Sequence, residues 1–251
     1  MFGAWQAGVW HALEGVFRPD LVIGASIGSI NGWIIASGAP VSELESLWLD
    51  PPLATQPKWR LPRRPWQGWA DPAPLEAAIR RIHQSYSPRI RYGVVLTRVP
   101  RLQPRLFTTD REVTWRHLMA SCAVPVVFPS CRLADDGRYV DGGFLGALPL
   151  WAAFEQGATE IVALNVMAHL PAAYTTMMRI LRRAAGWRAR IPEAAAVSIL
   201  QPDRRLGGVE DAMVWKRENI ERWIADGRTA GKRFAAGGGG FSFRAASRSG
   251  R

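Results

Sequence analysis

A serine framed by two glycines has the spacing needed for nucleophilic chemistry. Residues 24–28 read Gly-Ala-Ser-Ile-Gly and match the pattern Gly-x-Ser-x-Gly. In this pattern the serine lies on a sharp turn between a strand and a helix, where its hydroxyl is exposed. Ser26 is therefore a candidate nucleophile for acyl transfer, with Gly24 and Gly28 allowing strand and helix to approach closely. The alternative is a tight turn whose serine only caps the helix.

A serine nucleophile needs a base that accepts its proton, and two residues are candidates. Asp141 precedes Gly142 and Gly143, which would let the chain turn tightly and leave the carboxylate accessible. Taken alone, this pattern also fits an ordinary turn. His169 would complete the chain order Ser, Asp, His of a hydrolase triad, or it is simply a loop residue. A carboxylate acting alone would need partial desolvation and a direct hydrogen bond to the serine.

The elements around Ser26 fit a nucleophile turn. An apolar run at residues 20–24 predicts a buried strand, and residues 27–36 predict a helix. The start of that helix would point free amides, including the one of Ile27, toward a developing negative charge. Further helices are predicted at residues 4–14, 42–49, 75–84, 114–123, 150–156, 173–185 and 210–225. Further strands are predicted at residues 91–99, 105–109, 160–167 and 196–200, with a hairpin at 132–141. This alternation predicts a largely parallel sheet covered by helices on both faces.

The domain organisation follows from length and composition. The 251 residues suit one domain, predicted at residues 1–231, followed by a basic, glycine-rich disordered tail at 232–251. Within the domain, residues 51–74 are rich in proline, tryptophan and arginine, which predicts an excursion over the surface. It would either contact lipid head groups or pack its tryptophans on the core. No apolar run is long enough to cross a bilayer.

The start of the chain lacks the features of a secretory signal peptide, so we expect a cytoplasmic protein, with peripheral membrane contact as a further expectation. Cys122 and Cys131 carry no metal signature and are expected to be reduced. The net charge of +11 lies mostly in the last third, from Pro171 onward. This basic third would attract anionic phospholipid, or it is a solvated face. No nucleic-acid recognition motif is present, so no specific nucleic acid is expected as a partner.

Four motifs, taken together, resemble the patatin-like phospholipases. They are residues 3–14 (Gly-Ala-Trp-Gln-Ala-Gly-Val-Trp-His-Ala-Leu-Glu), the serine turn continued by Ser-Ile-Asn at 29–31, residues 120–129 with Pro125 and Phe128-Pro129, and Val-Asp-Gly-Gly at 140–143. They occur in family order. The resemblance implies a three-layer α/β/α fold and a Ser-Asp dyad without histidine, with Ser26 as nucleophile and Asp141 as base.

Two features depart from the family pattern. The glycine-rich oxyanion loop of the family would precede Ala4, and only its last glycine, Gly3, is present. We expect either a reading frame that starts upstream or a degenerate member. Residues 146–149 read Gly-Ala-Leu-Pro, where the family usually carries an asparagine, which concerns the shape of the site. Gly3 and Ile27 remain the candidate backbone donors to an oxyanion.

The predicted function is a serine-dependent lipid acyl hydrolase of the phospholipase A, lysophospholipase or esterase type. It is a carboxylic ester hydrolase acting on lipid or phospholipid esters through an acyl-serine intermediate, and it needs no cofactor or metal. Two alternatives stay open. One is a catalytically impaired binding module at an anionic membrane, and the other is a hydrolase with a Ser-His-Asp triad.

Overall fold

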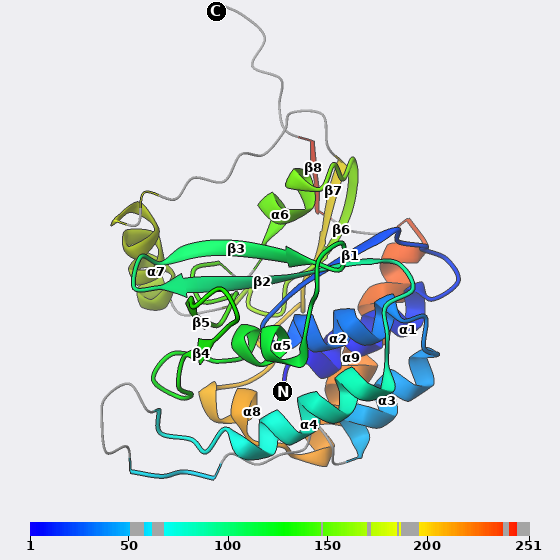
Figure 1. The fold of residues 1–251 in the computed structure, drawn as a ribbon. Coiled ribbons are helices and arrows are strands. Elements are labelled where there is room, and N and C mark those ends of the chain that lie inside the picture. Colours follow the sequence, from blue (N-terminus) through cyan, green and yellow to red (C-terminus); the bar gives the residue numbers. More distant parts are fainter. Residues whose placement is uncertain are drawn as a thin grey trace, which may run out of the picture.

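The computed structural model describes residues 1–50, 58–61, 68–146, 148–169, 172–184, 186, 196–237 and 241–244. Figure 1 shows how these elements are arranged. The helices are α1 (Gly3–Leu13), α2 (Ile27–Ala36), α3 (Val41–Leu49), α4 (Ala73–Ser85), α5 (Trp115–Ser121), α6 (Leu150–Glu155), α7 (Ala172–Ala184), α8 (Val209–Met213) and α9 (Arg217–Ala235). The strands are β1 (Leu21–Ala25), β2 (Arg91–Val99), β3 (Gln103–Thr108), β4 (Cys131–Arg132), β5 (Arg138–Val140), β6 (Glu160–Leu164), β7 (Ala196–Leu200) and β8 (Phe241–Arg244).

The described strands form two sheets, one of β1 to β5 and one of β6 to β8, and each sheet contains one parallel pair. β1 runs parallel to β2, and β6 runs parallel to β7. Strands β3, β5 and β8 add antiparallel pairs to β2 or β7, and β4 pairs with β5. Helices α2, α3 and α9 gather below β2 and β3 in Figure 1, and α6 lies above these two strands. The predicted α/β/α fold class is therefore confirmed.

The strand β2 brings two distant segments together. β3 occupies one edge of β2 along residues 93–98, so β1 and β5 share the other edge. On that edge Ala25, the last residue of β1, faces Val95, and Val140, the last residue of β5, faces Thr97. Because β1 is parallel to β2 and β5 is antiparallel to it, the carboxyl ends of both strands point toward the same place.

Helices α1 and α9 pack with almost no side chain between them at their crossing. A Cβ atom on Gly8 would overlap the carbonyl oxygen of Ile224, and one on Gly227 would overlap the carbonyl oxygen of Trp5. The rings of Trp5 and Trp223 are fully buried next to this crossing. The glycines thus fix the distance between the two helices, and α1 in turn packs against α2, which follows Ser26.

The structure differs from the predictions at the C-terminal end. The helix expected at residues 210–225 is divided into α8 and α9, with an interruption at residues 214–216. The tail expected at 232–251 is not wholly disordered, because α9 continues to Ala235 and β8 pairs with β7. Lys232 and Arg233 lie in the last turn of α9, where cations offset the negative end of the helix dipole. Basic residues at this position are therefore compatible with the end of a helix as well as with a disordered tail.

Several other predictions concern the surface. The hairpin expected at residues 132–141 is present, since β4 and β5 pair in antiparallel orientation. Of the predicted surface excursion at 51–74, residues 51–57 and 62–67 lie outside the described residues. Among the described helices, none is long and apolar enough to cross a membrane.

The glycine crossing leads to a prediction about stability. Gly227→Ala should lower the free energy of unfolding by about 2 kcal/mol or more, since the new methyl group forces α1 and α9 apart. Urea unfolding measures this change. Thr229→Ala, at an exposed position of the same helix, is the matched control and should change stability by no more than about 0.5 kcal/mol. Equal stability of the two variants would show that the crossing is not tightly packed.

Candidate active site

Ser26 occupies a strained turn between β1 and α2. Its backbone has φ 53° and ψ −135°, in a region that residues other than glycine rarely adopt. A Cβ on Gly24 would overlap the carbonyl of Gly28, so this close approach of strand and helix requires a glycine. Gly28 itself has room for a side chain, with Gln6 as its nearest neighbour at 3.6 Å. The turn leaves Ser26 only partly buried.

Ser26 and Asp141 are in direct contact although 115 residues separate them. The Ser26 hydroxyl donates a hydrogen bond of 2.5 Å to Oδ2 of Asp141. The other carboxylate oxygen accepts a hydrogen bond of 2.7 Å from the Gly143 amide. Asp141 is buried, with 4% of its surface exposed. Both carboxylate oxygens are therefore oriented, one of them toward the serine.

The environment of Asp141 makes its carboxylate more basic than usual. Burial raises the pKa of Asp141 from 3.8 to about 6, while hydrogen bonds from Ser26, Gly143 and Phe144 act in the opposite direction. The pKa rises because desolvation, which disfavours the charged carboxylate, has a larger effect than these hydrogen bonds. A carboxylate with such a pKa is still ionised at neutral pH and is better able to accept a proton.

Gly142 and Gly143 have different structural roles. A Cβ on Gly142 would overlap the carbonyl oxygen of Val95 in β2, so only glycine fits there. A Cβ on Gly143 would lie 3.2 Å from Oδ1 of Asp141 and 3.8 Å from the Cβ of Ser26, which places Gly143 beside both residues.

Ser121 is a supporting residue whose role the sequence analysis did not identify. Its fully buried hydroxyl accepts a 2.9 Å hydrogen bond from the Ser26 amide and donates a 2.8 Å hydrogen bond to the carbonyl of Val95. Ser121 therefore fastens the strained turn to β2. Its position within the motif at 120–129 was a signal, but a serine in such a sequence has no distinctive partner until the sheet is assembled.

Main-chain contacts hold Asp141 from two sides. The Asp141 amide donates to the carbonyl of Ala123 at 2.9 Å, and its carbonyl accepts from the Thr97 hydroxyl at 3.0 Å. Thr97 is fully buried in β2. The base is thus attached to the same strand as the nucleophile, and neither can shift without breaking several hydrogen bonds.

The two candidate oxyanion residues have different surroundings. Ile27 is the first residue of α2, where backbone amides have no partner within the helix and the helix dipole favours negative charge. Gly3 is buried at the start of α1, and a Cβ there would be 2.8 Å from Ile27 and would overlap Trp48. Its carbonyl accepts a hydrogen bond from Asn31, which ties α1 to α2. Gly3 therefore lies next to Ile27 and allows close packing there.

His169, Cys122 and Cys131 form no hydrogen bond with the dyad among the residues that the structure describes. A ring nitrogen of His169 is 2.8 Å from the carbonyl oxygen of Pro202, a contact that does not involve Ser26 or Asp141. Cys122 and Cys131 are free thiols, and burial raises the pKa of both. Within the described part of the chain, no group of His, Cys, Asp and Glu side chains is suited to hold a metal ion.

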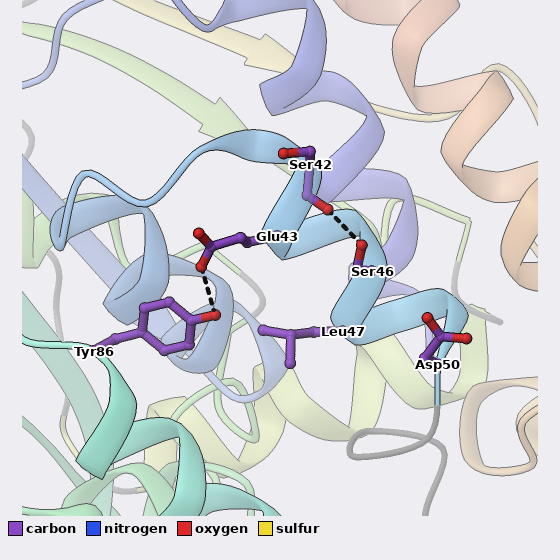
Figure 2. A pocket seen from close by; sticks show the side chains of 6 residues that line it. All are labelled: Ser42, Glu43, Ser46, Leu47, Asp50 and Tyr86. Carbon is purple, nitrogen blue, oxygen red and sulfur yellow. Dashed lines mark hydrogen bonds between the residues drawn. The ribbon is translucent and has the colours of Figure 1, made fainter.

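An open pocket lies on α3 (Figure 2). Its lining residues are Ser42, Glu43, Ser46, Leu47, Asp50 and Tyr86. Trp33, in the second half of α2, donates a hydrogen bond to the carbonyl of Tyr86. Since Ser26 precedes the first residue of α2, roughly 10 Å of helix separates the two places. This pocket holds no partner for the serine, and we assign it no part in the chemistry.

A family model matches the part of the chain that carries Ser26 and Asp141. The family model described as patatin-like phospholipase matches residues 1–154, more than half of the chain. The chain belongs to the patatin-like phospholipase family. The match includes the serine turn, Asp141 and the elements that carry them.

A solved structure supports the fold. The crystal structure of VipD from Legionella pneumophila matches with a TM-score of 0.52 and 11% sequence identity, over 96% of this patatin-like chain and 66% of VipD. The chain thus spans just under two thirds of the length of VipD. At this identity the likeness concerns the fold alone. A search of curated proteins gave no match.

The role of Ser121 can be tested directly. Ser121→Ala leaves the partly buried Ser26 amide without its acceptor, which should lower the free energy of unfolding by about 1–3 kcal/mol and slow the labelling of Ser26 by a fluorophosphonate probe. Ser37→Ala is the matched control, because Ser37, directly after α2, is also buried and its hydroxyl donates to the carbonyl of Ile34 in that helix. The control should lose some stability and keep its labelling rate. Equal labelling rates in both variants would contradict a positioning role for Ser121.

Proposed function

We propose that the chain is a serine-dependent carboxylic ester hydrolase that acts on lipid or phospholipid esters through a Ser-Asp dyad. One observation carries the proposal: the hydroxyl of a partly exposed serine donates directly to a buried carboxylate. The raised pKa of Asp141 supports its role as general base. The strained serine backbone supports a nucleophile, since such strain clusters at functional sites.

The reaction would proceed in two halves. Ser26 Oγ attacks the ester carbonyl carbon while Asp141 accepts the hydroxyl proton, and the ester carbonyl oxygen becomes an oxyanion near the Ile27 amide. The bond to the leaving alkoxide then breaks, and Asp141 returns the proton to it. In the second half, water attacks the acyl-serine and gives its proton to Asp141. The fatty acid leaves as Ser26 regains its proton, and every proton moves between the dyad, water and the substrate.

A Ser-His-Asp triad has less support. The direct contact between Ser26 and Asp141 leaves no place for an imidazole between them. The carbonyl of Pro202 already engages His169. The other alternative, a binding module without turnover, makes the opposite prediction for chemistry at Ser26 and is tested by the same variants.

The dyad is tested by hydrolysis of p-nitrophenyl esters. Asp141→Asn should reduce kcat/KM by about 10²- to 10⁴-fold, because the amide cannot accept the proton, and Ser26→Ala should abolish both hydrolysis and fluorophosphonate labelling. His169→Ala is the control and should retain full activity. Loss of activity in His169→Ala with activity kept in Asp141→Asn would favour the triad. A wild-type chain that neither hydrolyses esters nor reacts with the probe would favour the binding module.

The pKa of Asp141 predicts how activity depends on pH. The base must be ionised, so kcat/KM should rise as pH increases through about 6 and level off above it. Below that value activity should fall about tenfold per pH unit. A pH profile with a soluble ester measures this limb. A rate that is flat across this range would contradict Asp141 as the titrating base.

The ionised carboxylate of Asp141 should lower the free energy of unfolding. The pKa of Asp141 is raised on folding, so the ionised carboxylate opposes folding fully above pH 6, less as pH falls toward 3.8, and not at all below that value. Asp141→Asn should therefore raise the free energy of unfolding by up to about 3 kcal/mol above the pKa. The gain should vanish in acid, as urea unfolding at several pH values would measure. A variant less stable than wild type above pH 6 would contradict this account of the carboxylate.

A further inference from the structure

Exposed hydrophobic side chains gather on one surface beside the dyad. In the described part of the chain, eight large hydrophobic residues are exposed, and five of them lie on three neighbouring segments. These five residues, the apolar rim, are Trp59, Leu61, Trp69, Val124 and Val126. Their exposed fractions run from 41% for Val124 to 86% for Leu61. Contiguous exposure of this kind marks a contact surface.

Backbone hydrogen bonds hold the three segments side by side. The Arg60 amide donates to the carbonyl of Trp69, and the Trp69 amide donates to the carbonyl of Val126. Trp59 also forms an antiparallel bridge with Ala70. Segments joined in this way lie about 5 Å apart, which makes their exposed side chains neighbours. The apolar rim is therefore a built feature of the fold.

Strain at Val126 shows that its exposure is imposed by the structure. Its backbone has φ 72°, a conformation that is costly for a β-branched residue. Such strain persists only where the surroundings enforce it. Here the carbonyl of Val126 is fixed by Trp69, and the side chain is 69% exposed.

The valines of the apolar rim directly follow, along the chain, the residues that hold Ser26 and Asp141. Val124 follows Ala123, whose carbonyl accepts the hydrogen bond from the Asp141 amide. Two residues earlier, Ser121 holds the amide of Ser26. An ester brought to this rim would therefore be close to the nucleophile.

We propose that the apolar rim docks on the surface of an anionic phospholipid bilayer and presents Ser26 to it. Trp59 and Leu61 alternate with the exposed cations Lys58 and Arg60, in a chain with a net charge of +11. Tryptophan prefers the boundary between head groups and acyl chains, and cations near it attract anionic lipid. The choice of lipid as the occupant rests on the proposed function.

Vesicle sedimentation of the full chain tests the proposal. Wild type should bind vesicles of equal parts phosphatidylcholine and phosphatidylglycerol, and Trp59→Ser/Leu61→Ser should bind them at least about tenfold more weakly. Lys58→Glu should weaken binding to these vesicles and leave binding to pure phosphatidylcholine unchanged. Val16→Ser, at an exposed apolar position between α1 and β1, is the matched control and should bind like wild type.

Parallel measurements separate this proposal from the proposed function. The double variant should keep the wild-type urea midpoint and its rate on a soluble p-nitrophenyl ester, since it changes no group of the dyad. Vesicle binding is read without turnover, so an inactive chain that binds vesicles through the rim supports docking and contradicts only the hydrolase. Equal vesicle binding by wild type and the double variant, or none by wild type, overturns docking. Analytical ultracentrifugation without vesicles tests for self-association. If wild type forms a dimer that the double variant disrupts, while both bind vesicles equally, the rim is a protein interface and docking is also overturned.

Discussion

The site depends on the register of two short strands along one edge of β2. β1 ends opposite Val95 and β5 ends opposite Thr97, and both strands point toward the gap between these residues. Ser26 and Asp141 are the next residues of the chain, so their contact follows from strand pairing. A shift of one residue in β5 would move the carboxylate to the other face of the sheet. The hydrogen bond from Thr97 to Asp141 and the close fit of Gly142 on Val95 both resist that shift.

Holding the two groups in this way opposes folding locally. Ser26 adopts a strained backbone, and Asp141 is buried as an acid whose pKa is raised. Hydrogen bonds outside the reacting atoms offset the strain at Ser26 and the burial of Asp141. Ser121 accepts a hydrogen bond from the Ser26 amide, and the carbonyl of Ala123 accepts one from the Asp141 amide. The burial that opposes folding is the same burial that makes the carboxylate a stronger base, so stability and proton affinity change in opposite directions at this position.

How far the sequence could predict this arrangement depends on the range of the interactions. The turn at Ser26 is local, since an apolar run, a glycine-framed serine and a helix are all visible within residues 20–36. Asp141 was singled out by motif resemblance, but its contact with Ser26 arises from a β5 strand of only three residues, too short to show periodicity. Ser121 lies within the motif at 120–129, but its role depends on two distant partners, Ser26 at the turn between β1 and α2 and Val95 in β2, so the local sequence does not reveal it. The division of α8 from α9 and the strand β8 were missed for the same reason, as packing rather than composition decides them.

One segment connects all of these features. Between residues 121 and 126 the chain holds the amide of the nucleophile, then the amide of the base, and then reaches solvent with two exposed valines. Each of these roles uses a different group: the Ser121 side chain, the Ala123 backbone, and the side chains of Val124 and Val126. Because the backbone supports the base while the outer side chains face outward, the surface can change in sequence without moving the carboxylate. The groups that hold the dyad and the side chains that form the surface beside it are therefore physically separable, although both lie within residues 121–126.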